Sequence, residues 1–279
     1  MKALIDGDIL AYEIGSCTDD EGNPLAWPLC KARLDGKIKS IAERAGATSY
    51  TVFLTGDGNF RDEIATIRPY KGNRTGEKPH WHSKVISYLK ETSNHDVVVC
   101  EGYEADDGMS IEQCYGERAQ RDDGLDKLSK EMCQTIICSR DKDLHMVPGW
   151  HYSWGTGKQE EREPWFVTEE EGMKKFFLQL LTGDATDNIP GLYQIGPVKA
   201  EKLLDGITEP LSMYAVVKRE YELRFGSYWE QFMQENAALL WMLRDEPEDV
   251  GKHPEDQAYD LLYDFHTDLE DREEAKEEF

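Results

Sequence analysis

Four short apolar runs recur along the first half of the chain, and each ends in a polar loop. The runs are Lys2–Ile5, Tyr50–Leu54, Asp96–Cys100 and Thr135–Cys138. Stretches predicted to be helical alternate with them, at about Cys30–Ala45, His82–Thr92 and Ala105–Arg118. Continuous apolar strands that alternate with helices are typical of a parallel sheet covered on both faces. The first half is therefore predicted to have an α/β fold.

After Trp165 the pattern changes to helices without strands. Thr168 followed by three glutamates is a favourable helix start, and a Gly/Pro/Asp-rich turn region separates this helix from the next. The predicted helices are Glu169–Leu181, Pro197–Leu204, Leu211–Tyr221 and Tyr228–Arg244. The chain is thus expected to comprise an α/β domain (1–165), an α-helical part (166–269) and a solvated acidic tail (270–279).

Carboxylates gather where the predicted strands end. Ligand sites of parallel sheets form beyond the carboxyl ends of the strands, and an aspartate follows three of the four strands there. The acidic clusters are Asp6, Glu104/Asp106/Asp107, Asp141/Asp143 and Asp184/Asp187, with Asp57 as a ninth member. Carboxylates packed together repel one another unless cations neutralise them. Oxygen-only ligand sets suit magnesium or manganese, and two such ions roughly 4 Å apart hydrolyse phosphodiesters.

Composition narrows the class of protein. With 279 residues, 39% of them hydrophobic, the chain can form one large domain or one domain with a smaller module. No stretch approaches the roughly 20 apolar residues of a membrane helix, and no signal-peptide core follows Lys2. The six cysteines form no CxxC pair, which favours reduced core residues in a cytoplasmic protein over a zinc site.

The formal net charge of −24 is unusual for a nucleic-acid binder. Half of it lies between Asp245 and Phe279, where fifteen acidic residues face three basic ones. The nine clustered carboxylates account for most of the remainder. The rest of the chain is nearly neutral, so that local basic surfaces can form.

Several segments resemble the conserved blocks of the flap-endonuclease/5′→3′ exonuclease superfamily, in the same order. The metal-binding blocks are matched by Leu4–Gly7, Gly102–Asp107, Ser139–Leu144 and Leu181–Gly191, and the arch block by Phe60–Arg74. The resemblance spans about residues 2–205 and is greatest to the bacteriophage branch of free-standing 5′→3′ exonucleases. It implies a PIN-like core with an arch at about 60–80 and a helix–three-turn–helix motif at about 176–205.

The resemblance also implies roles for the carboxylates. A first metal would be organised by Asp6, Glu104, Asp106, Asp141 and Asp143, with Asp107 close by, and a second would be served by Asp184 and Asp187. The chain departs from the family at Asp57, which comes three residues later than the usual aspartate. Asp8 is either a helix N-cap or an additional ligand.

Basic and backbone contacts to DNA follow from the same resemblance. In the arch, Arg61, Arg68, Lys71 and Arg74 would contact DNA, with Lys71 and Arg74 stabilising charge on the scissile phosphate. Tyr70 either stacks on a terminal base or is a buried tyrosine.

In the hairpin, Gly191 and Gly196 would let the backbone approach a phosphate. The helix start at Pro197 would bind it, and Lys199 would add charge. Family members often hold a monovalent cation, expected to be K⁺, in this turn.

The predicted function is a structure-specific 5′→3′ exonuclease with flap-endonuclease activity that requires two Mg²⁺ ions, for which Mn²⁺ can substitute. Its partners would be DNA duplexes with a 5′ end, nick, gap or flap, or RNA–DNA hybrids. It would act in the cytoplasm, that of the host if phage-encoded. The alternatives are a PIN-type ribonuclease, whose domains are shorter and lack the arch and hairpin, and a non-catalytic DNA-binding protein of the same fold. Structural calcium binding is a third, but no D-x-D-x-D-G loop is present.

Overall fold

The computed structural model describes residues 1–121, 130–157, 159–247 and 253–277, which fall into two compact units. The first unit comprises Met1–Asn59 and Gly76–Thr168, and the second comprises Phe60–Thr75 and Glu169–Phe279. Two differences from the expected domains follow. The division lies three residues later than expected, and most of the segment predicted as an arch groups with the helical unit.

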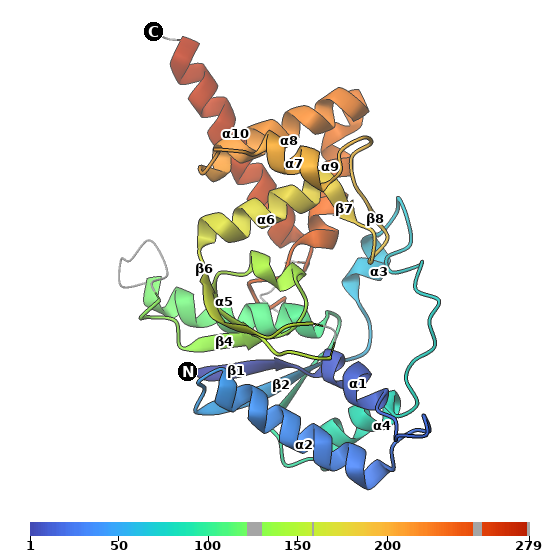
Figure 1. Cartoon of the computed structure of the whole chain (residues 1–279). Coiled ribbons are helices and arrows are strands. Elements are labelled where there is room, and N and C mark those ends of the chain that lie inside the picture. Colours follow the sequence, from blue (N-terminus) through green and yellow to red (C-terminus); the bar gives the residue numbers. More distant parts are fainter. Residues whose placement is uncertain (122–129, 158, 248–252, 278–279) are drawn as a thin grey trace. The chain divides into compact units, whose positions relative to one another are not determined.

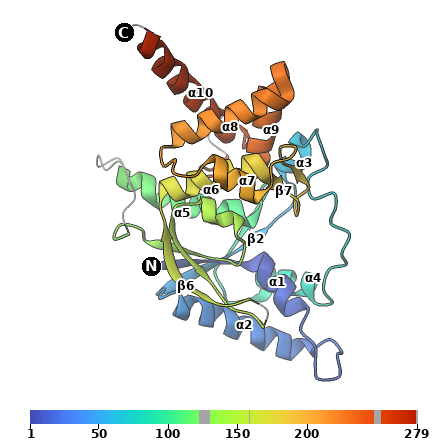
Figure 2. The same cartoon turned by 45° about the horizontal axis from the view of Figure 1, so that its top comes forward.

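A six-stranded sheet forms the centre of the first unit (Figures 1 and 2). Its order is β3-β2-β1-β4-β5-β6, and the first five of these strands are parallel while β6 is antiparallel to β5. The strands are β1 (Lys2–Asp6), β2 (Ser49–Thr55), β3 (Val97–Cys100), β4 (Thr135–Cys138), β5 (Gly149–Ser153) and β6 (Arg162–Val167). The four predicted strands are confirmed. The β5–β6 pair was not predicted.

Helices cover both faces of this sheet. Alternate strand residues such as Ile5, Leu54 and Cys138 share a core with α1 (Gly7–Gly15), α2 (Trp27–Arg44), α4 (His82–Ser87) and the π-helical turn η1 (Tyr88–Thr92). On the other face lies α5 (Ala105–Arg121), which approaches so closely that a Cβ atom at Gly108 would lie 2.3 Å from Cys100 Sγ. A short 3₁₀ helix, η2 (Asp143–Met146), follows β4.

Helix α1 corrects the expectation that Asp6-Gly7-Asp8 forms a loop. The helix begins at Gly7, directly after β1. A Cβ atom at Gly7 would lie 2.6 Å from the Phe53 carbonyl oxygen. This glycine therefore lets the helix start against β2 and does not mark a turn.

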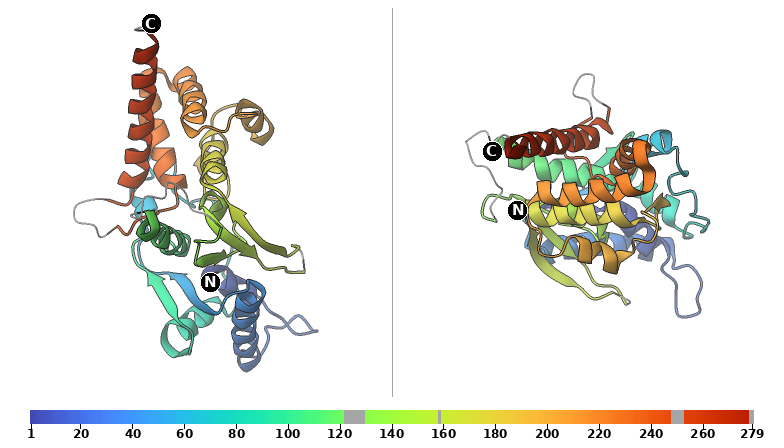
Figure 3. Two further views of the ribbon diagram at one scale, coloured as in Figure 1. Left: turned by 90° about the vertical axis from the view of Figure 1, so that its left-hand side faces the viewer. Right: turned by 90° about the horizontal axis from the view of Figure 1, so that it is seen from above.

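The second unit is helical. Its elements are α3 (Phe60–Ile64), α6 (Glu169–Thr182), the hairpin of β7 (Gly183–Asp184) and β8 (Ile189–Pro190), α7 (Pro197–Leu203), α8 (Pro210–Phe225), η3 (Gly226–Tyr228), α9 (Trp229–Leu240) and α10 (Asp256–Glu277). Helix α10 packs against α8 and α9 (Figure 3). In this contact the rings of Phe265 and Tyr214 are stacked, with their centroids 5.6 Å apart. No helix in the described part of the chain is long and apolar enough to cross a membrane.

The C-terminal end differs in part from the expected solvated tail. Residues 270–277 continue α10 as helix, and the side chains from Asp271 to Ala275 are exposed. Arg272 forms a two-fold ion pair with Glu209, with N–O distances of 2.8 and 2.9 Å. Residues 278–279 of the predicted tail lie outside the described residues.

Candidate functional site

The carboxyl ends of β1 and β4 are joined by a chain of hydrogen bonds. One carboxylate oxygen of Asp6 accepts from the Ile9 amide at 2.9 Å, which makes Asp6 the N-cap of α1. The other accepts from the Ser139 hydroxyl at 2.7 Å. The Ser139 hydroxyl in turn accepts from the Asp141 amide, and the Asp141 carboxylate accepts from the Asp143 amide. Three of the predicted ligands thus lie along one continuous network.

A second network joins the ends of β1 and β2 to the start of α5. The Thr55 hydroxyl donates to the Asp8 carboxylate and accepts from the Ala105 amide at 3.0 Å. Asp8 is therefore not the N-cap of α1, because Asp6 has that role. Its carboxylate instead helps to hold the start of α5, which carries Asp106 and Asp107 and directly follows Glu104.

The three carboxylates Glu104, Asp106 and Asp107 differ in how deeply they are buried. Asp107 is fully buried, and its carboxylate accepts from the Glu104 amide at 3.1 Å across the first turn of α5. Glu104 and Asp106 are half-buried at the same helix start. Asp107 thus stabilises the turn from which the other two carboxylates project.

Burial and neighbouring charges raise the pKa values of Asp6 and Asp8 at this edge. Burial is the main cause that raises the pKa of Asp6 to about 7, and the charges of Asp8 and Asp141 add to it. Burial likewise raises the pKa of Asp8, with a contribution from Glu104. These four carboxylates therefore interact electrostatically, and a divalent cation beside them would relieve the repulsion.

The side chains of this carboxylate edge offer oxygen atoms as ligands for a metal ion. Within the described ranges, no three His, Cys, Asp or Glu side chains are grouped as direct ligands of one ion. Mg²⁺ typically takes one or two carboxylates and keeps several water ligands. A hydrated Mg²⁺ is thus a group that these residues fit.

Asp57 lies apart from these networks. It is exposed in the loop after β2, where its amide donates to the Glu101 carboxylate at 2.7 Å and its carbonyl accepts from the Gly102 amide. Its described contacts are made by the main chain, and they tie this loop to the one after β3.

Tyr12 is a residue that sequence reasoning missed. It lies on α1 one turn after Asp8, and its side chain is 48% exposed. Its ring meets the His82 ring edge-on, with the two ring centroids 4.5 Å apart. The spacing of four residues from Asp8 was the available signal, because such residues share a helix face. Tyr12 is an aromatic surface beside the carboxylate edge.

In the second unit, Asp184 and Asp187 lie on the tight β7–β8 turn. One Asp184 carboxylate oxygen accepts from the amides of Thr186 and Asp187 at 2.6 and 3.3 Å. Gly191 supports this turn, because a Cβ atom there would lie 2.0 Å from the Thr182 carbonyl oxygen. This glycine serves close backbone packing, and its predicted contact with a phosphate stays a prediction.

The segment predicted as the arch is held to this turn through Asp187. The Tyr70 hydroxyl donates to the Asp187 carboxylate at 3.0 Å, the Arg74 guanidinium donates to it as well, and Lys71 Nζ lies 3.8 Å from it. The Lys71 amide also donates to the Asp187 carbonyl at 2.9 Å. Lys71 has a φ of 52°, an uncommon value for a non-glycine residue. Lys71, Arg74 and Asp187 thus form one cluster.

Two arch residues prove to be structural. Arg61, predicted to bind DNA, is 2% exposed, and its guanidinium donates to the carbonyls of Leu239 and Trp241 at 3.0 and 2.7 Å. It therefore anchors α3 to the end of α9. Tyr70 is 8% exposed, which decides for the buried alternative over base stacking. Arg68 is exposed, as a surface contact requires.

The hairpin between α6 and α7 presents both apolar and polar groups to solvent. Leu192 and Ile195 are buried, while Tyr193 is 79% and Val198 is 87% exposed. Lys199 is exposed, and a Cβ atom at Gly196 would meet open space. Arg224 of α8, which the sequence did not single out, donates from Nε to the Tyr193 carbonyl at 3.1 Å and so fixes the turn.

Comparisons with known proteins support the fold. The structure of T5 5′-exonuclease with bound divalent metal ions (zinc) is 18% identical, with coverage of 97% of this chain and 99% of that chain and a TM-score of 0.57. A bacteriophage T5 D15 flap endonuclease in complex with DNA and metal ions is 15% identical, with 95% and 98% coverage and a TM-score of 0.51. The predicted flap-endonuclease fold, a mostly parallel sheet with a helical C-terminal part, is confirmed.

One sequence relative adds to this likeness. DNA polymerase I of Rhizobium leguminosarum is 34% identical over 146 residues, which are 49% of this chain. The match covers 13% of the length of that polymerase. No family model matches the chain.

Proposed function

We propose that this protein is a divalent-metal-dependent 5′→3′ nuclease that cuts DNA phosphodiester bonds. The observation that carries the proposal is the hydrogen-bonded carboxylate edge, in which Asp6, Asp141 and Asp143 lie on one network after two parallel strands. Crowded carboxylates repel one another, and a divalent cation bound beside them would relieve this repulsion. The T5 relatives, whose structures contain metal ions and in one case DNA, support the same chemistry.

In this proposal Asp6, Glu104, Asp106, Asp141 and Asp143 organise the first ion, one or two of them as direct ligands and the others through its water ligands. Asp184 and Asp187 serve a second ion. Mg²⁺, when bound, would supply an activated water and would stabilise the leaving oxygen. The protein supplies the rest: Ser139 orients Asp6 and Asp141, and Asp107 fixes the helix start that carries Glu104 and Asp106.

Lys71 and Arg74 are proposed to act on the phosphate. Both cations are paired with Asp187 in the structure. A phosphodiester is also an anion, so it would compete with Asp187 for them. Their transfer to the phosphate would leave the Asp187 carboxylate able to accept a cation, which links substrate binding to metal binding.

Binding of duplex DNA is proposed for the hairpin between α6 and α7. The exposed Lys199 and the open backbone at Gly196 suit contact with phosphates, which positions DNA without reading its sequence. Tyr12 is proposed to stack on a base, in place of the buried Tyr70. A K⁺ ion in the hairpin turn is proposed as well, and it predicts tighter duplex binding in potassium than in lithium salts.

The decisive experiment uses 5′-flapped, nicked and RNA-primed duplexes labelled at either end. We expect cleavage from the 5′ side with Mg²⁺ or Mn²⁺ and none with EDTA. Asp143→Asn should lower turnover by at least about 100-fold, on the scale of one lost transition-state contact, whereas Asp20→Asn, a matched change on an exposed loop, should not. Near-normal turnover by Asp143→Asn in magnesium would refute the metal assignment. Cleavage of single-stranded RNA alone would favour the PIN-type ribonuclease.

A further inference from the structure

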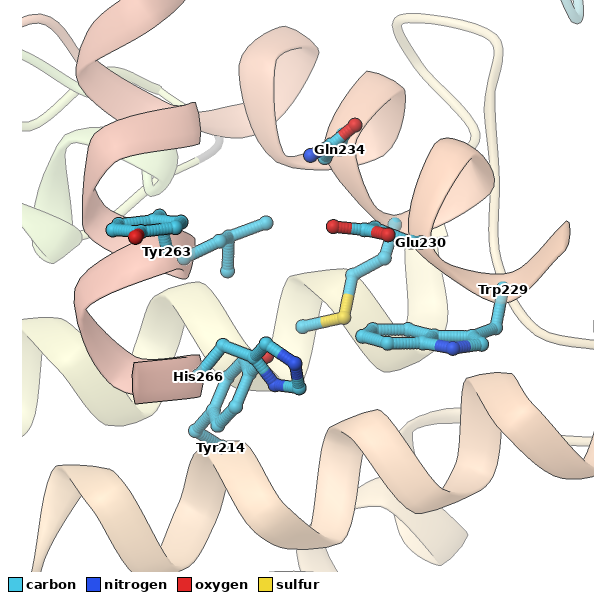
Figure 4. Close-up of a pocket in the computed structure, with 8 residues that line it drawn as sticks. Tyr214, Trp229, Glu230, Gln234, Tyr263 and His266 are labelled. Carbon is cyan, nitrogen blue, oxygen red and sulfur yellow. The ribbon is translucent and has the colours of Figure 1, made fainter. Parts of the chain in front are cut away.

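A small cavity opens where α8, α9 and α10 meet in the second unit, and it is unrelated to the carboxylate edge (Figure 4). Its volume is about 40 Å³. The lining includes Tyr214, Trp229, Glu230, Met233, Tyr263 and His266. Figure 4 shows Tyr263 of α10 and Trp229 of α9 on opposite sides of the space.

The size of the cavity limits what it can hold. Pockets for cofactors and drug-sized ligands have volumes of about 300–1,000 Å³, whereas one water needs about 10–15 Å³. A cavity of about 40 Å³ therefore accommodates the end of one side chain. Tyr263 is 69% exposed, so that an incoming chain can reach the cavity from solvent.

The chemistry of the lining suits a cation. Aromatic faces attract ammonium and guanidinium groups. Trp229 shows this within the chain, since Lys218 Nζ lies 5.2 Å from the centre of its ring. Glu230 adds a carboxylate at the cavity itself. His266 contributes a buried Nδ1 atom that has no hydrogen-bond partner among the described residues.

The surroundings are strongly acidic. Glu222, Glu230 and Glu270, one from each of the three helices, act electrostatically on the Tyr214 hydroxyl. Lys218 of α8, the cation beside Trp229, is paired with Glu222 at 2.8 Å. Helix α10 carries nine acidic residues against Arg272 and Lys276, and Arg272 is paired with Glu209. Such a surface repels DNA and attracts a basic partner.

We propose that this cavity and the acidic surface of α10 dock a basic segment of a partner protein. One lysine or arginine side chain of that segment enters between Tyr263 and Trp229, and neighbouring basic residues face Glu230 and the carboxylates of α10. The acidic surface favours a basic polypeptide as the partner. The small volume of the cavity leaves room for only one side chain of that polypeptide.

The test titrates the full chain into a fluorescein-labelled ten-residue peptide of alternating lysine and serine, with fluorescence anisotropy as the readout. We expect saturable binding that weakens with salt. Tyr263→Ala should weaken it by about fivefold or more, the scale of a cation–π contact of about 1 kcal/mol. Glu230→Gln should weaken it as well. Because Tyr263 is mostly exposed, its replacement should leave the fold intact.

Matched controls separate the anchor from general attraction between charges. Tyr228→Ala removes another exposed tyrosine (66%) that is not part of the lining, and Asp205→Asn removes an exposed charge elsewhere. Both should bind like the wild type. Equal affinity of Tyr263→Ala and wild type would show attraction between charges alone and overturn the proposal. Equally tight binding of a leucine–serine peptide, or of the acetylated lysine peptide, would overturn the basic partner. None of these outcomes bears on nuclease activity.

Discussion

Residues of one type differ in role according to which contacts their surroundings provide. Arg61 and Arg74 belong to the same basic segment, and the sequence predicted DNA contacts for both. Arg61 is buried and donates to two carbonyls at the C-terminal end of α9, whereas Arg74 pairs with Asp187 while half of its side chain stays exposed. The difference depends on partners more than 100 residues away in the chain, which local sequence patterns do not contain.

Arg61→Ala is expected to destabilise the protein without acting on chemistry. It leaves the carbonyls of Leu239 and Trp241 without a guanidinium donor, and buried unsatisfied groups cost about 1–3 kcal/mol each. The free energy of unfolding, measured with urea, should fall by at least about 2 kcal/mol. The exposed Arg68→Ala should change it by less than about 0.5 kcal/mol. A normal unfolding curve for Arg61→Ala together with weak DNA binding would contradict this structural role and would indicate that Arg61 contacts DNA.

His151 should make stability depend on pH. Burial lowers its pKa from about 6.5 to about 3, and a nitrogen of its ring hydrogen-bonds the Val147 carbonyl at 2.7 Å. Between these two pH values the unfolded chain binds a proton that the folded chain does not. The stability that neutral, buried His151 contributes to the folded state is therefore fully present above about pH 6.5. It declines as the pH falls toward 3.

The measurement compares unfolding at pH 7.5 and 5.0 for the wild type and His151→Gln. The glutamine can still donate to Val147 but does not titrate. The variant should be less stable at pH 7.5 and lose less stability in acid. An equal acid loss in both proteins would assign the dependence to other groups.

At the scale of elements, the strands were the most predictable part. Their apolar runs are continuous because both faces of the sheet are covered, and Ile5 and Leu54 are fully buried. Helix α1 was missed because Gly7 reads as a turn residue, and β5 was missed because its buried His151 interrupts the apolar pattern. Helix α10 was missed because its acids mask the apolar positions Ala258, Leu262 and Phe265.

The predicted site was likewise recovered only in part. The carboxylates after β1 and β4 could be inferred because parallel strands end at one edge. Their connection through Ser139, the role of Thr55 and the pairing of Asp187 with Lys71 and Arg74 could not. These depend on side-chain contacts between segments distant in sequence.

The cluster around Asp187 predicts a separation of rate from affinity. Lys71→Ala should slow single-turnover cleavage by about 100-fold or more and change duplex affinity little. Lys78→Ala, an exposed lysine a few residues on, serves as the matched control. Lys71→Gly relieves the positive φ without restoring the charge, so it should be as slow as the alanine variant. Recovery of rate by the glycine would show that backbone strain, and not the lost cation, causes the defect.

The hairpin predicts the opposite separation. Lys199→Ala should weaken binding to every duplex sequence and flatten the log–log salt dependence by about 0.9 per lost phosphate contact. Turnover at saturating DNA should persist, because uniform binding does not help the chemical step. Arg224→Ala should weaken binding through the released Tyr193 carbonyl, but its salt slope should stay closer to that of the wild type. If both variants bind normally, the Gly191–Lys199 turn is a structural hairpin only.

At the scale of the whole molecule, the net charge of −24 opposes DNA binding, and its distribution determines how strongly. Removal of Asp271–Phe279 deletes five carboxylates and two cations. It also breaks the Arg272–Glu209 ion pair, which is exposed and should therefore contribute little stability. Duplex affinity should rise at about 50 mM salt and return to the wild-type value by about 200 mM, since screening acts beyond roughly 10 Å at 0.1 M.

Arg272→Ala in the full-length chain breaks the same ion pair while making the protein more acidic, so it should not raise affinity. A gain in affinity for both proteins would show that release of α10 from Glu209, and not charge, controls access to DNA. A large fall in melting temperature of the truncated protein alone would show that the deleted turns of α10 pack against the rest of the second unit.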